Sequence, residues 1–141
     1  MKVEIIVSKK DAAGMNIAEF LKNENLNGAS LHFMEEESVF CEDIDNEIDA
    51  DLFIFATKHQ SASGVPSLCV HTPGNWGKAD YGGKDKELGI APASYLKAAF
   101  LKLVELSKER ELNYEVIQEC THHGPFISKP CMFIEIGSTE K

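Results

Sequence analysis

The hydrophobic residues of this chain fall into short runs that predict the strands of a β-sheet. The run Asp51–Thr57 is aromatic or aliphatic at most positions, which is typical of a central strand buried on both faces. A weaker pattern around Val39 and Phe40 predicts one further short strand. The remaining runs of strand-like composition are residues 2–7, Ser30–Phe33, Ser67–His71, Tyr114–Ile117 and Cys131–Ile136.

Two segments carry the apolar spacing of amphipathic helices. Asp11 suits the N-cap of the first, whose predicted core face is Ala13, Ile17, Phe20 and Leu21. Pro92 suits the first turn of the second, predicted over Ala93–Leu112 with the core face Leu96, Ala99, Phe100, Leu103 and Leu106. Strands that alternate with helices predict an α/β fold, with a mixed β-sheet flanked by helices in a single domain over residues 1–141.

The charge of the chain is concentrated in one segment. The formal net charge is −9, and nine acidic residues with no lysine or arginine lie between Glu35 and Asp51. We expect this segment to be solvated surface; a carboxylate metal site is the alternative, although no calcium-loop pattern is present. Five lysines flank the candidate loops described below: Lys58, Lys78, Lys84, Lys86 and Lys129. On charge alone we expect them to be solvated surface; a locally positive mouth on the acidic body is the alternative.

Targeting signals and common cofactor motifs are missing from the sequence. No apolar run approaches the ~20 residues of a membrane span, and the N-terminal region lacks the pattern of a signal peptide. We therefore expect a cytoplasmic monomer without a membrane or protein partner. The four cysteines form no C-x-x-C motif and are expected to be free thiols. Gly82-Gly83-Lys84 lacks the spacing of a nucleotide-binding P-loop, which excludes an NTPase.

Polar clusters follow three of the predicted strands. Because ligands of open α/β sheets bind where strands end, we expect these clusters to meet at one rim of the sheet, with Glu135 on the last strand carried into the same region. The clusters are Lys58 and His59; His71, Thr72, Gly74 and Trp76; and His122, His123, Gly124 and Lys129.

Imidazoles beside a carboxylate predict hydrolysis of an ester or an amide. A histidine that titrates near neutral pH can take a proton from water, while a carboxylate fixes its tautomer. We assign the catalytic roles to His122, His123, Glu135, Lys58 and His59. Substrate binding is assigned to His71, Thr72, Gly74, Trp76, Gly124 and Lys129, with the amides of Thr72, Gly74 or Gly124 stabilising an oxyanion and Trp76 stacking on a base.

Two other chemistries stay open on the residues alone. Cys120 lies two residues from His122 and could act as a nucleophile, although catalytic pairs are normally distant in sequence. Alternatively, Cys69-x-His71 and Cys120-x-His122 each place two soft ligands on one strand face. Two such pairs could complete a tetrahedral zinc site, with Cys69, His71, Cys120 and His122 as candidate ligands.

Two long motifs resemble one known family. Residues Phe55–Gly77 resemble the "ATKH…VHTPGNWG" block of the D-aminoacyl-tRNA deacylases of the archaeal and plant type. Glu119–Phe126 and Met132–Glu140 resemble the "THHGP" and "FIE.GST" blocks of the same family. The resemblance extends over the whole chain, and family members run on substantially further, so we expect this chain to be shorter than its relatives.

The resemblance implies hydrolysis of the ester that joins a D-amino acid to the 3′ end of tRNA, which keeps D-residues out of translation. It also implies a fold related to peptidyl-tRNA hydrolase and the phosphorylases, and zinc as a cofactor. A non-catalytic module that binds the tRNA acceptor end and a zinc-dependent hydrolase of a small-molecule ester remain the alternatives. The matched motif positions are Lys58, His59, His71, Thr72, His122, His123 and Glu135.

Overall fold

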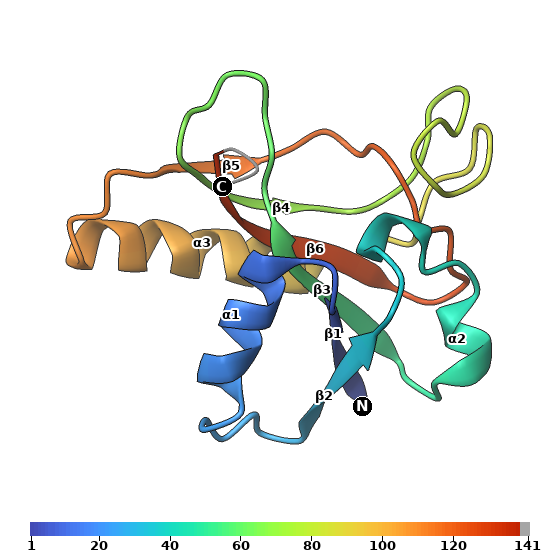
Figure 1. The fold of residues 1–141 in the computed structure, drawn as a ribbon, viewed down its shortest axis with the longest axis horizontal. Coiled ribbons are helices and arrows are strands. Elements are labelled where there is room, and N and C mark those ends of the chain that lie inside the picture. Colours follow the sequence, from blue (N-terminus) through green and yellow to red (C-terminus); the bar gives the residue numbers. More distant parts are fainter. Residues whose placement is uncertain (139–141) are drawn as a thin grey trace.

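The computed structural model describes residues 1–138, which form a six-stranded mixed β-sheet flanked by helices (Figure 1). The predicted fold class is therefore confirmed; Thr139 and Glu140 of the last motif lie outside the described residues. The elements are β1 Val3–Ser8, α1 Ala12–Leu21, β2 Ala29–Met34, η1 Ser38–Phe40, α2 Ile44–Glu47, β3 Leu52–Lys58, β4 Ser67–His71, α3 Ala93–Glu109, β5 Glu115–Gln118 and β6 Cys131–Gly137.

The strand order is β2-β1-β3-β6-β4-β5. Strands β2, β1, β3 and β6 are mutually parallel, whereas β4 runs antiparallel to β6 and β5 runs parallel to β4. The sheet thus consists of two parallel groups that point in opposite directions and join at the β6–β4 pair.

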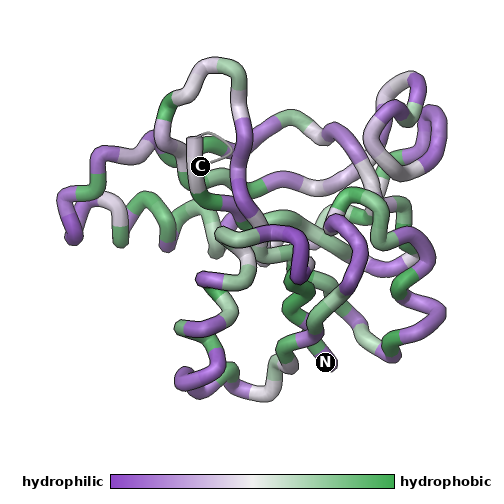
Figure 2. The backbone as a smooth tube through the Cα atoms, viewed as in Figure 1, coloured by the Kyte–Doolittle hydropathy of each residue, from purple (hydrophilic) through white to green (hydrophobic). Residues whose placement is uncertain are grey.

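The two faces of the sheet are covered differently. Helices α1 and α3 cover one face, which we call the helix face, and pack on residues such as Val7, Ala56, Val70 and Met132. Short helix α2 and the long connections cover the other face, here called the loop face, over Phe53, Phe55, Cys131 and Phe133. Figure 2 shows the hydrophobic residues gathered along the strands, while the loop between β4 and α3 projects from the body and is mainly hydrophilic.

Two details of the predicted elements are wrong. The residues around Val39 and Phe40 form the 3-10 helix η1 rather than a strand, because a helical path places Cys41 and Ile44 together in the loop-face core. Phe20 is 70% exposed rather than buried. Helix α1 instead packs through Gly14 and Ala18, since a Cβ at position 14 would lie 2.7 Å from a strand carbonyl oxygen and only glycine permits that approach.

Candidate active site on the loop face of the sheet

Strand register places the candidate residues on the loop face. Thr57 and Cys69 both pair with Glu135, and in the next row Phe55 and His71 both pair with Phe133. Directly paired residues share a face, and so do residues two apart on a strand. The predicted meeting at one rim is wrong, because β4 points opposite to β3 and β6 and their carboxyl ends lie at opposite edges. The clusters meet instead above the middle of the sheet.

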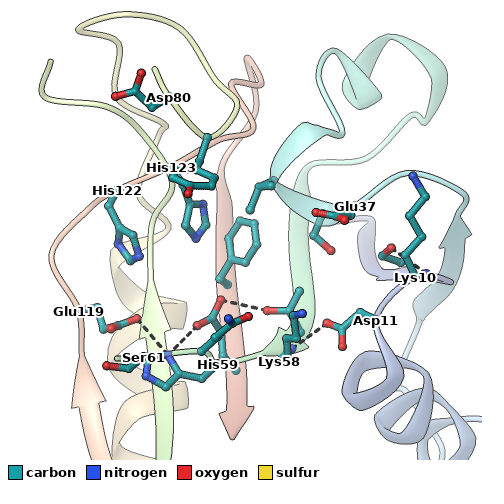
Figure 3. Close-up of a pocket in the computed structure, with 18 of the residues that line it drawn as sticks. Lys10, Asp11, Glu37, Lys58, His59, Ser61, Asp80, Glu119, His122 and His123 are labelled. Carbon is teal, nitrogen blue, oxygen red and sulfur yellow. Dashed lines mark hydrogen bonds and ion pairs between the residues drawn. The ribbon is translucent and has the colours of Figure 1, made fainter. Parts of the chain in front are cut away.

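Glu135 and His59 form a buried acid–imidazole pair at the end of β3 (Figure 3). The Glu135 carboxylate accepts a hydrogen bond from Thr57 Oγ1 at 3.0 Å and lies 3.3 Å from Nδ1 of His59. The hydrogen bond to Glu135 raises the pKa of His59, outweighing the opposing effect of burial. The pair therefore fixes the His59 tautomer with its proton on Nδ1.

Glu119 lies beside this pair and was not singled out by the sequence analysis. Its Oε2 atom is 3.6 Å from Nδ1 of His59 and 3.8 Å from Nδ1 of His71, and it is buried without a hydrogen-bond partner. Ile117 pairs with Cys69 across β5 and β4, so strand alternation turns Glu119 onto the loop face next to His71. That alternation is readable in the sequence once the β5–β4 pairing is known.

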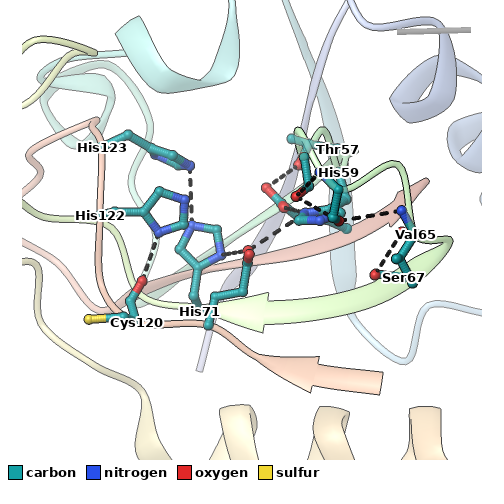
Figure 4. Close-up of polar contacts among 12 residues, drawn as sticks. Thr57, His59, Val65, Ser67, His71, Cys120, His122 and His123 are labelled. Atoms are coloured by element: carbon teal, nitrogen blue, oxygen red, sulfur yellow. Dashed lines mark hydrogen bonds and ion pairs between the residues drawn. The ribbon is translucent and has the colours of Figure 1, made fainter. Parts of the chain in front are cut away.

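Three histidines pack against one another above Phe133 (Figure 4). The His71 ring stacks on His122 with centroids 4.6 Å apart, and its Nε2 lies 3.2 Å from Nε2 of His123. Burial, reinforced by the neighbouring imidazoles, lowers the pKa of His71 to about 2 and that of His123 to about 4. Both rings are therefore neutral at physiological pH.

Hydrogen bonds between loops hold His123 in place. His123 adopts a left-handed backbone conformation with φ of 48°, and its carbonyl oxygen accepts a hydrogen bond from the Gly74 amide at 2.7 Å. The Gly124 amide donates to the carbonyl of Tyr81, also at 2.7 Å. Both glycine amides are thus already occupied, which contradicts their predicted role in holding an oxyanion.

The acidic segment contributes to the same construction. The Glu42 carboxylate accepts backbone hydrogen bonds from Gly83 and, at 2.9 Å, from Phe126. Asp45 accepts from the Ser128 amide at 2.8 Å. The expectation of purely solvated surface is wrong for these two carboxylates. Glu42 joins the loop of Gly83 to the loop that carries His122 and His123, and Asp45 joins the latter loop to helix α2.

A cavity of about 960 Å³ opens above these residues and is named the site cavity. Figure 3 shows His122 and His123 on one side and Lys10, Asp11 and Glu37 on the other. Its floor includes Thr57, His59, Glu119, Phe133 and Glu135, and the lining extends to Lys58, Lys78 and Tyr81. All six predicted substrate-binding residues lie outside this lining: His71, Thr72, Gly74, Trp76, Gly124 and Lys129.

Positions outside the lining differ in character. His71 is buried within the histidine cluster, and Thr72, the next residue, is buried as well; its Oγ1 atom has no hydrogen-bond partner. Trp76 is 68% exposed on the projecting loop, and Lys129 is exposed as well. The exposed aromatic side chain that does line the site cavity is Tyr81.

Within residues 1–138, three groups of side chains have the spacing of metal ligands. One is His71, His122 and His123; the others are His59, Cys69 and Glu119, and His71, Glu119 and Glu135. Cys120 belongs to none of these groups, and Cys69 joins a different group from His122. The predicted pairing of two Cys-x-His units around one ion is therefore not the arrangement found. The link between Cys120 and His122 is a hydrogen bond of 2.7 Å from Nδ1 to the Cys120 carbonyl.

Fold and site together define an α/β protein whose central sheet carries a cavity lined by imidazoles and carboxylates, a combination suited to acid–base chemistry. Over residues 46–141 the chain matches the family model of D-aminoacyl-tRNA deacylase. It is 39% identical to the D-aminoacyl-tRNA deacylase of Pyrococcus furiosus and 36% identical to that of Thermococcus onnurineus, each over 100% of this chain. The chain belongs to the D-aminoacyl-tRNA deacylase family.

The chain spans 59% of the length of both relatives. A crystal structure of a conserved protein of unknown function superimposes with a TM-score of 0.88 at 31% identity, covering 99% of this chain and 56% of the other. Among the described residues, no helix combines the length and apolarity needed to cross a membrane.

Proposed function

We propose that this chain hydrolyses the ester bond between a D-amino acid and the 3′ end of tRNA, releasing the amino acid and free tRNA. Membership of the deacylase family supports this reaction, and one observation carries it: the buried His59–Glu135 pair borders the site cavity. An ester hydrolase needs a base that takes a proton from water and a cavity that receives the ester, and both are found together here.

In this proposal His59 is the general base. Its Nδ1 donates to Glu135, which leaves Nε2 free of a proton and able to accept one from water. The raised pKa makes His59 a stronger base than an isolated imidazole. His123, with a pKa of about 4, is a weak base. We therefore assign the proton transfer to His59 rather than to His122 or His123.

The size and lining of the site cavity suit the acceptor end of a charged tRNA. Its volume of about 960 Å³ lies at the upper end of the ~300–1,000 Å³ range of small-molecule sites, enough for an aminoacylated nucleoside. Lys10, Lys58 and Lys78 border it and can meet phosphate groups. In place of Trp76, we propose Tyr81 as the ring that stacks on a terminal base.

We also propose zinc as the cofactor, held by His71, His122 and His123. Their ring nitrogens lie within 4.8 Å of one another, and neutral imidazoles are the form that binds zinc. Nδ1 of His122 and Nδ1 of His123 already donate to backbone carbonyls. Metal-bound histidines usually donate their second ring N–H in this way, which fixes the orientation of the ring. When bound, such an ion would polarise a carbonyl oxygen or lower the pKa of a water molecule.

Deacylation of D-tyrosyl-tRNA and L-tyrosyl-tRNA tests the proposed reaction. We expect decay of the D-form only, and a fall of about 10²–10⁴-fold in kcat for His59→Gln, the range typical of general acid–base catalysis. His32→Gln is the matched control, because His32 lies on strand β2 and is not part of the cavity lining. The Pyrococcus furiosus relative serves as the reference for substrate quality.

Equal decay of both substrates would contradict the proposal. Salt-dependent binding of deacylated tRNA without turnover would instead select a non-catalytic acceptor-end module.

A further inference from the structure

Hydrogen bonds to backbone carbonyls fix the tautomers of two of the clustered histidines. Nδ1 of His122 lies 2.7 Å from the Cys120 carbonyl oxygen, and Nδ1 of His123 lies 2.6 Å from the Gly124 carbonyl oxygen. A carbonyl oxygen only accepts, so each neutral ring carries its proton on Nδ1. In its neutral form, each ring therefore has an unprotonated Nε2.

His71 lies between His123 and Glu119 and has one proton for two contacts. Its Nε2 faces the unprotonated Nε2 of His123 at 3.2 Å, and its Nδ1 faces Glu119 Oε2 at 3.8 Å. A neutral imidazole can supply a proton to only one of these contacts, which leaves two lone pairs facing each other at the other contact. His71 is buried, and burial opposes a second proton on its ring. A cation beside the facing lone pairs would relieve this repulsion.

We infer that Glu119 is the positioning residue of a metal centre: it holds the His71 proton on Nδ1, so that Nε2 of His71 joins Nε2 of His122 and Nε2 of His123 around a divalent zinc ion. This inference rests on the zinc part of the proposed function. It accounts for two buried polar atoms without hydrogen-bond partners, Nδ1 of His71 and Oε2 of Glu119, which face each other. A carboxylate behind a metal-bound histidine is the usual outer partner of zinc sites.

The distances agree with this assignment. Tetrahedral bonds of about 2.0–2.1 Å place ligand atoms about 3.3–3.4 Å apart. The separation of 3.2 Å between the Nε2 atoms of His71 and His123 is close to that value. The third ligand, His122, lies on the exposed side of the cluster, and its ring offers a nitrogen within 4.8 Å of the other two ligand atoms.

The sheet fixes the positions of His71 and Glu119. The His71 ring stacks on Phe133 with centroids 5.1 Å apart and planes within 17°, which holds the plane of the imidazole. The Glu119 amide donates to the Val70 carbonyl at 3.1 Å, next to His71 on β4. Backbone pairing of β5 with β4 therefore brings the carboxylate beside the imidazole before any ion binds.

Zinc affinity, measured by competition with a chromophoric chelator, tests the inference. We expect wild-type protein to bind zinc, and Glu119→Gln and Glu119→Ala to weaken that binding about 10–100-fold, the usual effect of losing an outer-shell partner. Glu115→Gln is the matched control, because Glu115 is an exposed carboxylate on β5, the strand that Glu119 directly follows. Its affinity should stay within about twofold of wild type, since a distant surface charge touches no ligand.

Cobalt substitution gives a second readout that a purely structural role would not change. We expect wild type to show the visible absorption of tetrahedral cobalt with nitrogen ligands, and Glu119→Gln to alter its intensity while circular dichroism shows an intact fold.

Three results would overturn the inference: no zinc binding by wild type, unchanged affinity in both Glu119 variants, or a thiolate-to-cobalt band that disappears in Cys69→Ser. The last would move the ion to His59, Cys69 and Glu119. None of these measurements uses tRNA, so they are separate from a failure of deacylation.

Discussion

The buried pair of His59 and Glu135 makes a specific prediction about stability and its pH dependence. Glu135→Gln keeps the size of the side chain and an acceptor for Thr57 but removes the charge that faces Nδ1 of His59. His59 is 5% exposed and Glu135 is 8% exposed, so solvent screens this contact little. Losing a hydrogen bond to a charged group costs about 1.5–3 kcal/mol.

The sign of the pH dependence follows from the raised pKa of His59. A group with a pKa higher in the folded than in the unfolded state binds its proton more tightly on folding. Its contribution is complete below the unfolded pKa of about 6.5 and is lost as pH rises through the folded value. The difference in unfolding free energy between wild type and Glu135→Gln should therefore be largest near pH 6. It should shrink by pH 9 toward the ~1 kcal/mol of a neutral hydrogen bond.

Thermal unfolding at several pH values measures this difference. An unfolding entropy of about 2.1 cal/mol/K per residue gives about 0.3 kcal/mol/K for a chain of this length. A loss of ~1.5–3 kcal/mol then lowers Tm by roughly 5–10 °C near pH 6. His59→Gln and the double variant complete a double-mutant cycle, which isolates the coupling between the two side chains. A Tm difference that grows with pH, or a coupling energy of zero, would refute the reasoning.

Three further predictions concern the loops, the thiols and the helix cap. Gly124→Ala places a Cβ 2.3–2.4 Å from backbone atoms of the Gly82–Gly83 loop and of helix η1, so we expect a loss of about 1–3 kcal/mol in urea unfolding. Gly77→Ala, whose Cβ meets open space, should change stability by less than ~0.5 kcal/mol. A thiol reagent should label only Cys120 in the native protein, because the other three cysteines are buried and burial raises their pKa values to about 11 or about 12. Peptide mass spectrometry identifies the labelled site, and labelling of a second thiol at the same rate would contradict this prediction. Asp11→Ala removes both the N-cap of α1 and the acceptor of the Lys58 amide. It should lower the free energy of unfolding by about 1–3 kcal/mol in the same urea assay. A change below ~0.5 kcal/mol would show that neither hydrogen bond contributes to stability.

Several features of the site follow from local sequence, while others require the strand pairing. His122 and His123 could be selected as reactive residues because two imidazoles beside Gly-Pro are unusual in any loop. Glu119 could not, because nothing in its neighbourhood distinguishes it from a surface carboxylate until β5 pairs with β4. Trp76 carried a strong local signal as the only tryptophan, yet its side chain is not part of the cavity lining, although Lys78 and Tyr81 of the same loop are.

The sequence by itself determined the elements and the residue types available for chemistry. Strand runs such as Leu52–Lys58 and the long helix α3 depend on hydrophobic spacing, which is a local property and survives in any tertiary arrangement.

Only the tertiary structure decided how these residues meet. The antiparallel insertion of β4 beside β6 turned His71 and Glu135 onto one face and set Glu119 between two imidazoles. The hydrophobic pattern selects which face of a strand is buried. Which strands become neighbours depends on contacts between residues distant in the chain, as in the β3–β6 and β6–β4 pairs, and no local pattern specifies that.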